Sequence, residues 1–155
     1  MNLAEILSED LICPELSAVD RYEAIDELMD ILVNHHEVRI VHRQAVLNEI
    51  IKREKAMSTG IGDHVAIPHA KTQHVPDITA AVGISKQGID FDSIDGRPVH
   101  IIVLLLIPQE SYNKHLKTLA DIARLSKKAS FRDSLVRAKT SQEILGIIEL
   151  EEERE

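Results

Sequence analysis

Hydrophobic residues recur at helical spacing in the first third of the sequence. Asp20 followed by Glu23 resembles a capping box, and the hydrophobic positions after it have the period of an amphipathic helix that reaches Asn34. A second helix is predicted over about residues 43–53. It should end before the stretch 58–62, where two glycines interrupt the period, and the loop that follows should be irregular.

Two stretches in the middle of the chain are predicted as strands. Residues 78–85 are rich in small and β-branched side chains and lie between Pro76 and the turn residues 86–88. VHIIVLLLIP, residues 99–108, is a continuous hydrophobic run that ends at a proline, and it is typical of a strand buried on both faces. Such a strand requires helices on both sides of its sheet.

Further helices are predicted toward the C-terminus. Hydrophobic positions in 116–125 form one stripe, a short helix should span about 130–138, and Thr140 with Glu143 forms a second capping box. The charge run 151–155 has nothing to bury, so we expect a frayed or disordered tail there. Helices and strands alternate unevenly, which predicts a single-domain α/β sandwich with a mixed sheet flanked by helices on both faces.

Composition fits one domain and excludes several classes of function. The 155 residues are 44% hydrophobic and 28% charged, which is ordinary for a domain with one core. The single cysteine, Cys13, excludes an intramolecular disulfide and a cysteine-rich metal site, and favours a reducing compartment. The net charge of −8, with scattered basic residues, opposes nucleic-acid binding.

The beginning of the chain and its hydrophobic runs bear on location. The acidic start MNLAEILSEDL differs from a secretory signal, which begins with a basic region. The longest hydrophobic run is too short to cross a bilayer, which takes about 20 residues. We therefore expect a cytoplasmic protein without direct membrane insertion.

One segment, REKAMSTGIGDHVAIPHAK (residues 53–71), carries the groups that a phosphate site needs. Arg53 can form a forked pair of hydrogen bonds with phosphate oxygens. Ser58 and Thr59 offer hydroxyls, and two glycines allow backbone N–H groups to approach an anion. His69 follows a proline, which presents the imidazole on a stiff segment. An imidazole can attack phosphorus near neutral pH because its ordinary pKa is about 6.5, so we expect no metal and no other cofactor.

The histidines also allow less specific interpretations. A histidine that follows a proline is often structural. His64, His69 and His74 are evenly spaced, which suggests a metal site. The five-residue interval does not align them on one helical face, and Pro68 prevents a helix there, so zinc is not expected. His115 can be read as a partly buried histidine in the first turn of an amphipathic helix, where the helix dipole should keep its imidazole mainly neutral.

The chain from about residue 3 to residue 150 resembles the EIIA domains of the fructose/mannitol and nitrogen-regulatory branch of the phosphotransferase system. The most specific part is the segment quoted above, with its arginine-glutamate pair, STGIG and AIPH. FDSIDGRPVHIIVLLLIP and HLKTLADIARL are similar to two further segments of that family. The resemblance implies an EIIA domain over residues 1–150, an acidic tail over 151–155, and a mixed sheet of roughly five strands.

The resemblance also implies roles for individual residues. His69 is then the phosphoacceptor of a phosphotransferase, Arg53 binds the phosphoryl oxygens, and His115 lies close to His69 and assists through hydrogen bonding. Ser58 and Thr59 are expected to line the phosphate pocket. The implied phosphate donor is HPr or its nitrogen-branch homologue, charged by enzyme I from phosphoenolpyruvate.

The recipient of the phosphoryl group stays open at this point. In sugar transport it is an EIIB domain of a fructose/mannitol-type transporter. The alternative is a standalone nitrogen-regulatory EIIA, whose phosphorylation state changes which regulatory target proteins it binds. Neither an EIIB nor an EIIC region is recognised in the chain, so the regulatory alternative stays open. A homodimer is also compatible with the sequence.

Two positions depart from the family pattern. Asp63-His64 stands where many members have a small or amide pair, and Ala70 stands where many have glycine. Ala70 would be a problem only if that position required a positive φ. His64 adds an ionisable side chain near the site, and we hypothesise that it alters the lifetime of the phosphohistidine.

Overall fold

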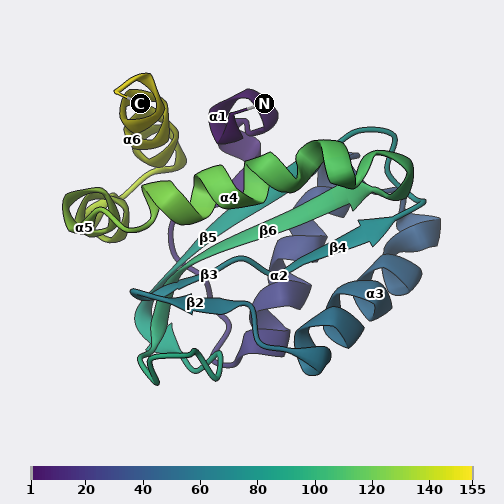
Figure 1. Cartoon of the computed structure of the whole chain (residues 1–155), viewed down its shortest axis with the longest axis horizontal. Coiled ribbons are helices and arrows are strands. Elements are labelled where there is room, and N and C mark those ends of the chain that lie inside the picture. The colour runs from purple at the N-terminus through teal and green to yellow at the C-terminus, as the bar shows by residue number, and fades with distance from the viewer. Residues whose placement is uncertain (1, 155) are drawn as a thin grey trace.

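The hydrophobic strand β6 (Val99–Pro108) lies at the centre of the molecule (Figure 1). In the computed structural model, which describes residues 2–154, every residue of β6 except His100 is buried. β5 (Thr79–Ile89) pairs with it in antiparallel fashion on one side. On the other side β3 (Val65–Ala66) and β4 (His69–Thr72) pair with successive parts of β6 in parallel. A strand buried on both faces reads as a continuous hydrophobic run, as predicted.

Two short strands complete a mixed sheet. β1 (Ile12–Cys13) pairs in parallel with β5, and β2 (Gly60–Gly62) pairs in antiparallel fashion with β3. The resulting order is β1-β5-β6-β3-β2, with β4 beside β6. The predicted mixed α/β architecture is confirmed, with six strands in the described residues instead of roughly five.

One helical layer consists of α2 (Arg21–Asn34) and α3 (Arg43–Ala56). The Asp20 side chain accepts a hydrogen bond from the backbone N–H of Glu23, so the predicted capping box begins α2. α2 packs on β5, and α3 packs on α2 and on β4. Both helices lie behind the sheet in Figure 1. This layer places the last turns of α3 beside the strand that begins with His69.

The opposite layer consists of α4 (Leu116–Leu125), α5 (Ala129–Arg137), α6 (Ser141–Glu153) and α1 (Leu3–Ile6). α4 crosses in front of the sheet in Figure 1, α5 contacts β5 and β6, and α6 contacts β1 and α1. The second predicted capping box also forms, because Thr140 accepts from the backbone N–H of Glu143. Buried side chains fill the space under these helices: Val82, Ile101, Val103, Ile122, Leu125, Phe131, Leu135 and Ile148. Helices therefore cover both faces of the sheet, as predicted.

Short 3-10 helices connect several elements: η1 (Glu9–Leu11), η2 (Ile40–His42), η3 (Gln109–Ser111) and η4 (Asn113–His115). Among the residues that the structure describes, no helix combines the length and the hydrophobicity of a membrane span.

The prediction of an irregular loop after α3 is wrong, because this part of the chain contains β2, β3 and β4. These strands have only two to four residues each, which is too short for a hydrophobic period to show. The strand predicted to end at the turn 86–88 also runs further, since β5 reaches Ile89. Gly88 has φ +88°, and the pairing with β6 is irregular between Ile84 and Ile89, so the strand bends there without ending.

The prediction of a frayed tail is wrong for the described residues, because α6 continues to Glu153. Glu151 is buried and accepts a hydrogen bond from Nζ of Lys128 at 2.8 Å. Glu152 accepts from the backbone N–H groups of Leu3 and Ala4 at 2.7 and 2.9 Å, at the beginning of α1. A carboxylate stabilises a helix N-terminus, so Glu152 holds α6 against the beginning of α1. Residue 155 lies outside the described residues.

Candidate active site

His69 is the first residue of β4, and its backbone is fixed by β6. It pairs with Leu105, whose N–H donates to the carbonyl oxygen of Pro68 at 2.9 Å. The half-buried imidazole has its Nδ1 at 2.8 Å from the carbonyl oxygen of Ile67. A carbonyl oxygen can only accept, so Nδ1 carries the proton. The other ring nitrogen, Nε2, then carries the free electron pair.

The surroundings of His69 favour the neutral imidazole. Its pKa is lowered, mainly because burial disfavours the charged form and also because of the positive charge of Arg53. The hydrogen bond to Ile67 and the negative charge of Glu54 act in the opposite direction and only partly offset these effects. His69 is therefore uncharged near neutral pH, as a nucleophile must be.

His69 and Arg53 line the same hollow on the surface. The hollow has a volume of about 430 Å³ and lies between the last turns of α3 and the edge of the sheet at β4. Its lining residues are Glu49, Lys52, Arg53, Ala56, His69, Ala70, Lys71 and Tyr112. The packing of α3 on β4 thus brings together Arg53 and His69, which are sixteen positions apart in the sequence.

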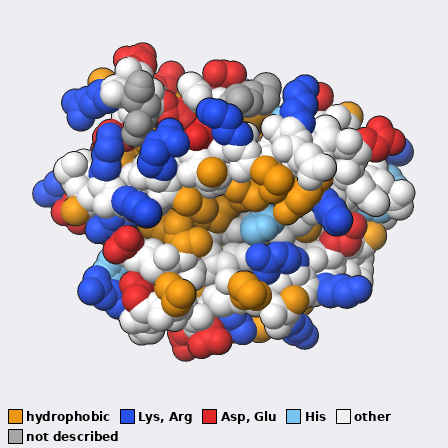
Figure 2. Space-filling view, viewed as in Figure 1, with side chains coloured by type: hydrophobic (Ala, Val, Ile, Leu, Met, Phe, Trp, Pro, Cys, Tyr) orange, Lys and Arg blue, Asp and Glu red, His pale blue; other side chains and the backbone are white. Residues whose placement is uncertain are grey.

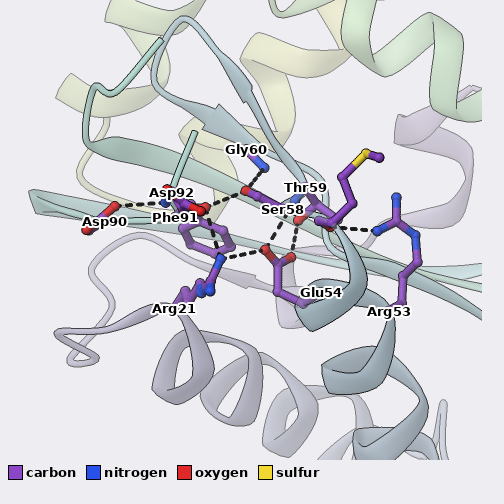
Figure 3. A network of polar contacts seen from close by, with 10 residues as sticks. Arg21, Arg53, Glu54, Ser58, Thr59, Gly60, Asp90, Phe91 and Asp92 are labelled. Carbon is purple, nitrogen blue, oxygen red and sulfur yellow. Dashed lines mark hydrogen bonds and ion pairs between the residues drawn. The ribbon is translucent and has the colours of Figure 1, made fainter. Parts of the chain in front are cut away.

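The Arg53 side chain is held in place at one end of its guanidinium. Nη1 donates to the carbonyl oxygen of Met57 at 2.7 Å, which also satisfies a carbonyl just beyond the last turn of α3 (Figure 3). In the described part of the chain this is the one hydrogen bond of the Arg53 side chain. Its other N–H groups are available to an anion, for which a guanidinium is well suited.

Two further basic residues of the hollow were not predicted. Lys52 of α3 and Lys71 of β4 line it together with Arg53, against the single carboxylate of Glu49. Glu49 accepts a hydrogen bond from the hydroxyl of Thr72 at 2.7 Å, and the Lys71 ammonium lies 5.5 Å from the centre of the Tyr112 ring. The positive charge exceeds the negative charge, which suits a phosphoryl group. Helical spacing backward from Arg53 could have identified Glu49, four positions earlier, as a neighbour on one face.

Ser58 and Thr59 follow the end of α3, and their hydroxyls contact protein groups (Figure 3). The Ser58 hydroxyl donates to the carbonyl oxygen of Phe91 and accepts from the N–H of Gly60 at 3.0 Å. The hydroxyl of Thr59 donates to Glu54, and Thr59 is buried. Neither residue lines the hollow. Contact of these hydroxyls with phosphate stays a prediction.

His115 ends η4 and directly precedes α4. It is half-buried, and among the described residues its side chain forms no hydrogen bond, with His69 or with any other group. Its pKa is lowered, first by burial and then by the nearby charge of Lys114, so the neutral form is favoured as expected. His115 does not line the hollow. Its assistance to His69 stays a prediction.

The two glycines of STGIG have structural roles in β2. A side chain at Gly60 would collide with Ser93, and Gly62 has φ +90°, which residues with a side chain rarely adopt. The next two residues, Asp63 and His64, have φ of 56° and 68° and form the turn from β2 to β3. Ala70 does not have a positive φ, so alanine fits there without strain.

The site is therefore a neutral, half-buried histidine beside a basic hollow on an α/β sandwich, as expected of a protein that carries phosphate on histidine. The chain matches the family described as "Phosphoenolpyruvate-dependent sugar phosphotransferase system, EIIA 2" over residues 5–150. The chain belongs to this EIIA family.

Relatives of both predicted kinds are found. The fructose-specific EIIABC component of Bacillus subtilis is 33% identical over 96% of this chain, which spans only 23% of that protein. The fructose-specific EIIA component of Haloferax volcanii is 31% identical, over 95% of this chain and 94% of that protein. The nitrogen regulatory protein of Escherichia coli is 41% identical, over 68% of this chain and 65% of that protein.

Solved structures share the fold. The nitrogen regulatory protein IIA-Ntr of Neisseria meningitidis has a TM-score of 0.85 and 29% identity, over 94% of this chain and 97% of that one. IIA mannitol of Escherichia coli has a TM-score of 0.78 over 92% of this chain and 98% of that one, and at 17% identity it supports the fold alone.

Proposed function

We propose that this protein accepts a phosphoryl group on Nε2 of His69 and passes it to a second protein. The observation that carries the proposal is the hydrogen bond between Nδ1 of His69 and Ile67, which leaves the electron pair on the nitrogen that is free to react. The donor is phosphorylated HPr or its nitrogen-branch homologue.

The transfer step follows from these groups. The Nε2 electron pair attacks phosphorus, and the bond from phosphorus to the donor's histidine nitrogen breaks, so that this electron pair returns to the donor. The His69 ring gains positive charge as the new bond forms, which strengthens the hydrogen bond from Nδ1 to Ile67. Arg53 stabilises the negative charge on the phosphoryl oxygens with its available N–H groups.

The face in front of the sheet suits a protein donor and a protein recipient. Figure 2 shows a band of hydrophobic side chains on this face, with a histidine and basic side chains beside it. Exposed hydrophobic residues include Leu116 at the beginning of α4 and Ile61 in β2, 44% and 42% exposed. Hydrophobic surface ringed by charge is typical of an interaction surface. A distant structural neighbour at 18% identity was solved as the "Complex of enzyme IIAMTL and phosphorylated enzyme IIBMTL".

The experiment incubates the protein with phosphoenolpyruvate, enzyme I and HPr. We expect phosphate that is labile in acid and stable in base, and that is absent from the His69→Ala variant. His74→Ala removes another histidine, five residues after His69, and is the matched control, which should be labelled like the unmodified protein. Label that persists in His69→Ala would refute the proposal.

The recipient separates two versions of this function. The fructose-specific relatives favour an EIIB domain of a fructose/mannitol-type transporter. The nitrogen-regulatory relatives, and the high TM-score with IIA-Ntr, favour a regulatory protein whose binding depends on phosphorylation. Transfer from the labelled protein to an EIIB domain, with formation of sugar phosphate, supports transport. Failure with every EIIB domain, together with phosphorylation-sensitive binding to other proteins, supports regulation.

A further inference from the structure

Glu54 is a buried acidic residue that the phosphoryl transfer described above does not use. It directly follows Arg53 in the last turns of α3, and its side chain is 0% exposed. Successive helical residues point about 100° apart, and Arg53 and Glu54 leave α3 in different directions (Figure 3). Arg53 therefore lines the hollow while Glu54 is buried. A buried carboxylate is costly unless its oxygens have partners, which makes those partners informative.

Three donors surround the Glu54 carboxylate. Oε2 accepts from the backbone N–H of Thr59 at 3.1 Å and from Nη1 of Arg21 at 3.3 Å, while Oε1 accepts from the Thr59 hydroxyl. The same Arg21 nitrogen donates to the carbonyl oxygen of Phe91 at 3.2 Å, and this oxygen also accepts from Ser58. Glu54 thus holds the segment between α3 and β2, and Arg21 of α2 holds Glu54.

The hydrogen bonds continue from Thr59 to the imidazole of His69. The carbonyl oxygen of Thr59 accepts from the N–H of Ile67 at 3.0 Å. The carbonyl oxygen of Ile67 in turn lies 2.8 Å from Nδ1 of His69. Contacts therefore run without a gap from Glu54 through Thr59 and Ile67 to His69. The position of the Ile67 carbonyl decides which ring nitrogen holds the proton.

We propose that Glu54, oriented by Arg21, is a positioning residue that keeps the His69 proton on Nδ1 and the electron pair on Nε2. The inference deepens the proposed function and rests on it for its effect on transfer, but the protonation of the ring can be observed without any phosphate donor. Without the carboxylate, the N–H and the hydroxyl of Thr59 lose their acceptor inside the protein. Thr59 then shifts to find other partners, and the Ile67 carbonyl is no longer fixed.

The experiment compares Glu54→Ala and Glu54→Gln with a matched variant, Glu151→Ala. Glu151 is also a buried glutamate, 8% exposed in its side chain, and it pairs with Lys128 at 2.8 Å in the opposite helical layer. The first readout is the NMR shifts of the imidazole nitrogens of His69 in the unphosphorylated, isotope-labelled protein. The second is the rate of phosphoryl transfer from phosphorylated HPr.

We expect a single tautomer, with Nδ1 protonated, in the unmodified protein and in Glu151→Ala. In Glu54→Ala both tautomers should be populated, and transfer should be about a hundredfold slower, as for a misplaced reacting group. Glu54→Gln should restore most of the rate, because its amide can accept from the Thr59 N–H and donate to the Thr59 hydroxyl. A loss of stability alone would affect Glu54→Ala and Glu151→Ala alike.

The inference is overturned if folded Glu54→Ala keeps the single tautomer and the unmodified rate, or if Glu151→Ala changes the tautomer equally. If Glu54→Ala does not fold, Thr59→Val and Arg21→Met replace it, and each should shift the tautomer in the same direction by less. An unchanged tautomer in both would equally overturn the inference. A wild-type protein that takes no phosphate on His69 would contradict the proposed function instead, and the tautomer would still decide the role of Glu54.

Discussion

The region around His69 and the layer under α4, α5 and α6 are stabilised in different ways. Around His69, buried polar groups are joined by hydrogen bonds from Arg21 to the imidazole itself. Under the helices, side chains such as Phe131, Leu135 and Ile148 fill the space with hydrophobic contacts. Hydrogen bonds fix directions and protonation, whereas hydrophobic burial is not directional. The first region should therefore determine chemistry, and the second should mainly determine stability.

After loss of His69 itself, Arg53→Met and Glu54→Ala are expected to slow phosphoryl transfer the most. Loss of a group that stabilises developing charge typically slows a reaction by about a hundredfold, so transfer from phosphorylated HPr should fall by about this factor. Arg43→Met is the control, because it removes the same charge from the same helix at a residue paired with Asp26 and Asp30. Similar transfer rates for the two variants would show that Arg53 has no specific role in phosphoryl transfer.

On the stability side, Leu135→Ala should have a large effect on unfolding and none on the site. Leu135 is 2% exposed, and truncating a buried leucine typically costs about 2–5 kcal/mol in the free energy of unfolding. Denaturant unfolding measures this loss. At a temperature where the variant is folded, the His69 tautomer and the transfer rate should equal those of the unmodified protein. A changed tautomer would show that the two regions are not separate.

A smaller effect concerns the pH dependence of phosphate acceptance. In the proposed transfer the neutral imidazole of His69 is the nucleophile, so phosphate acceptance should fall as the pH drops through the pKa of His69, which lies below the ordinary value. Because the positive charge of Arg53 contributes to the lowering, Arg53→Met should raise this pKa, and the midpoint should move to higher pH. An NMR titration of His69 measures both proteins, and a midpoint that moves to lower pH would contradict the electrostatic account.

The smallest effect is expected from His64→Asn. His64 lies at the turn before β3, and its Nδ1 is 2.8 Å from the carbonyl oxygen of Pro98. Val65, which follows His64, pairs with Ile101 of β6, and His69 pairs with Leu105. Four residues of a strand span about 13 Å, so Val65 and His69 lie about this far apart along β6. We therefore expect equal rates of phosphohistidine hydrolysis in the variant and in the unmodified protein. Different rates would support the hypothesis that His64 alters the lifetime of the phosphohistidine.

The elements predicted correctly are those whose signals are local. Both capping boxes join residues three positions apart, and β6 is indicated by a hydrophobic run in which His100 is the one polar residue. β4 could not be predicted in the same way, because it has four residues and its partner on β6 lies far along the chain. The continuation of α6 into the charged residues could not be predicted either, because the groups that donate to Glu152 lie at the other end of the sequence.

The candidate site likewise contains residues that a local segment predicts and one whose role depends on distant partners. His69 and Arg53 were predicted from one short segment, and the structure adds that α3 and β4 place both beside one hollow. Glu54 stands in the same segment, but its significance depends on Arg21, which lies 33 positions away on another helix. Nothing in the local pattern distinguishes a buried glutamate of this kind from an exposed one at the end of a helix. Its role becomes visible only with its partners in place.

The central claim is that a neutral His69 reacts through Nε2 while Nδ1 holds the proton. The most direct measurement is the nitrogen NMR spectrum of the isotope-labelled protein after incubation with phosphoenolpyruvate, enzyme I and HPr. We predict a phosphorus-nitrogen coupling at Nε2 of His69 and a proton that remains on Nδ1. Phosphate on Nδ1 of His69, or on any other residue, would contradict this account.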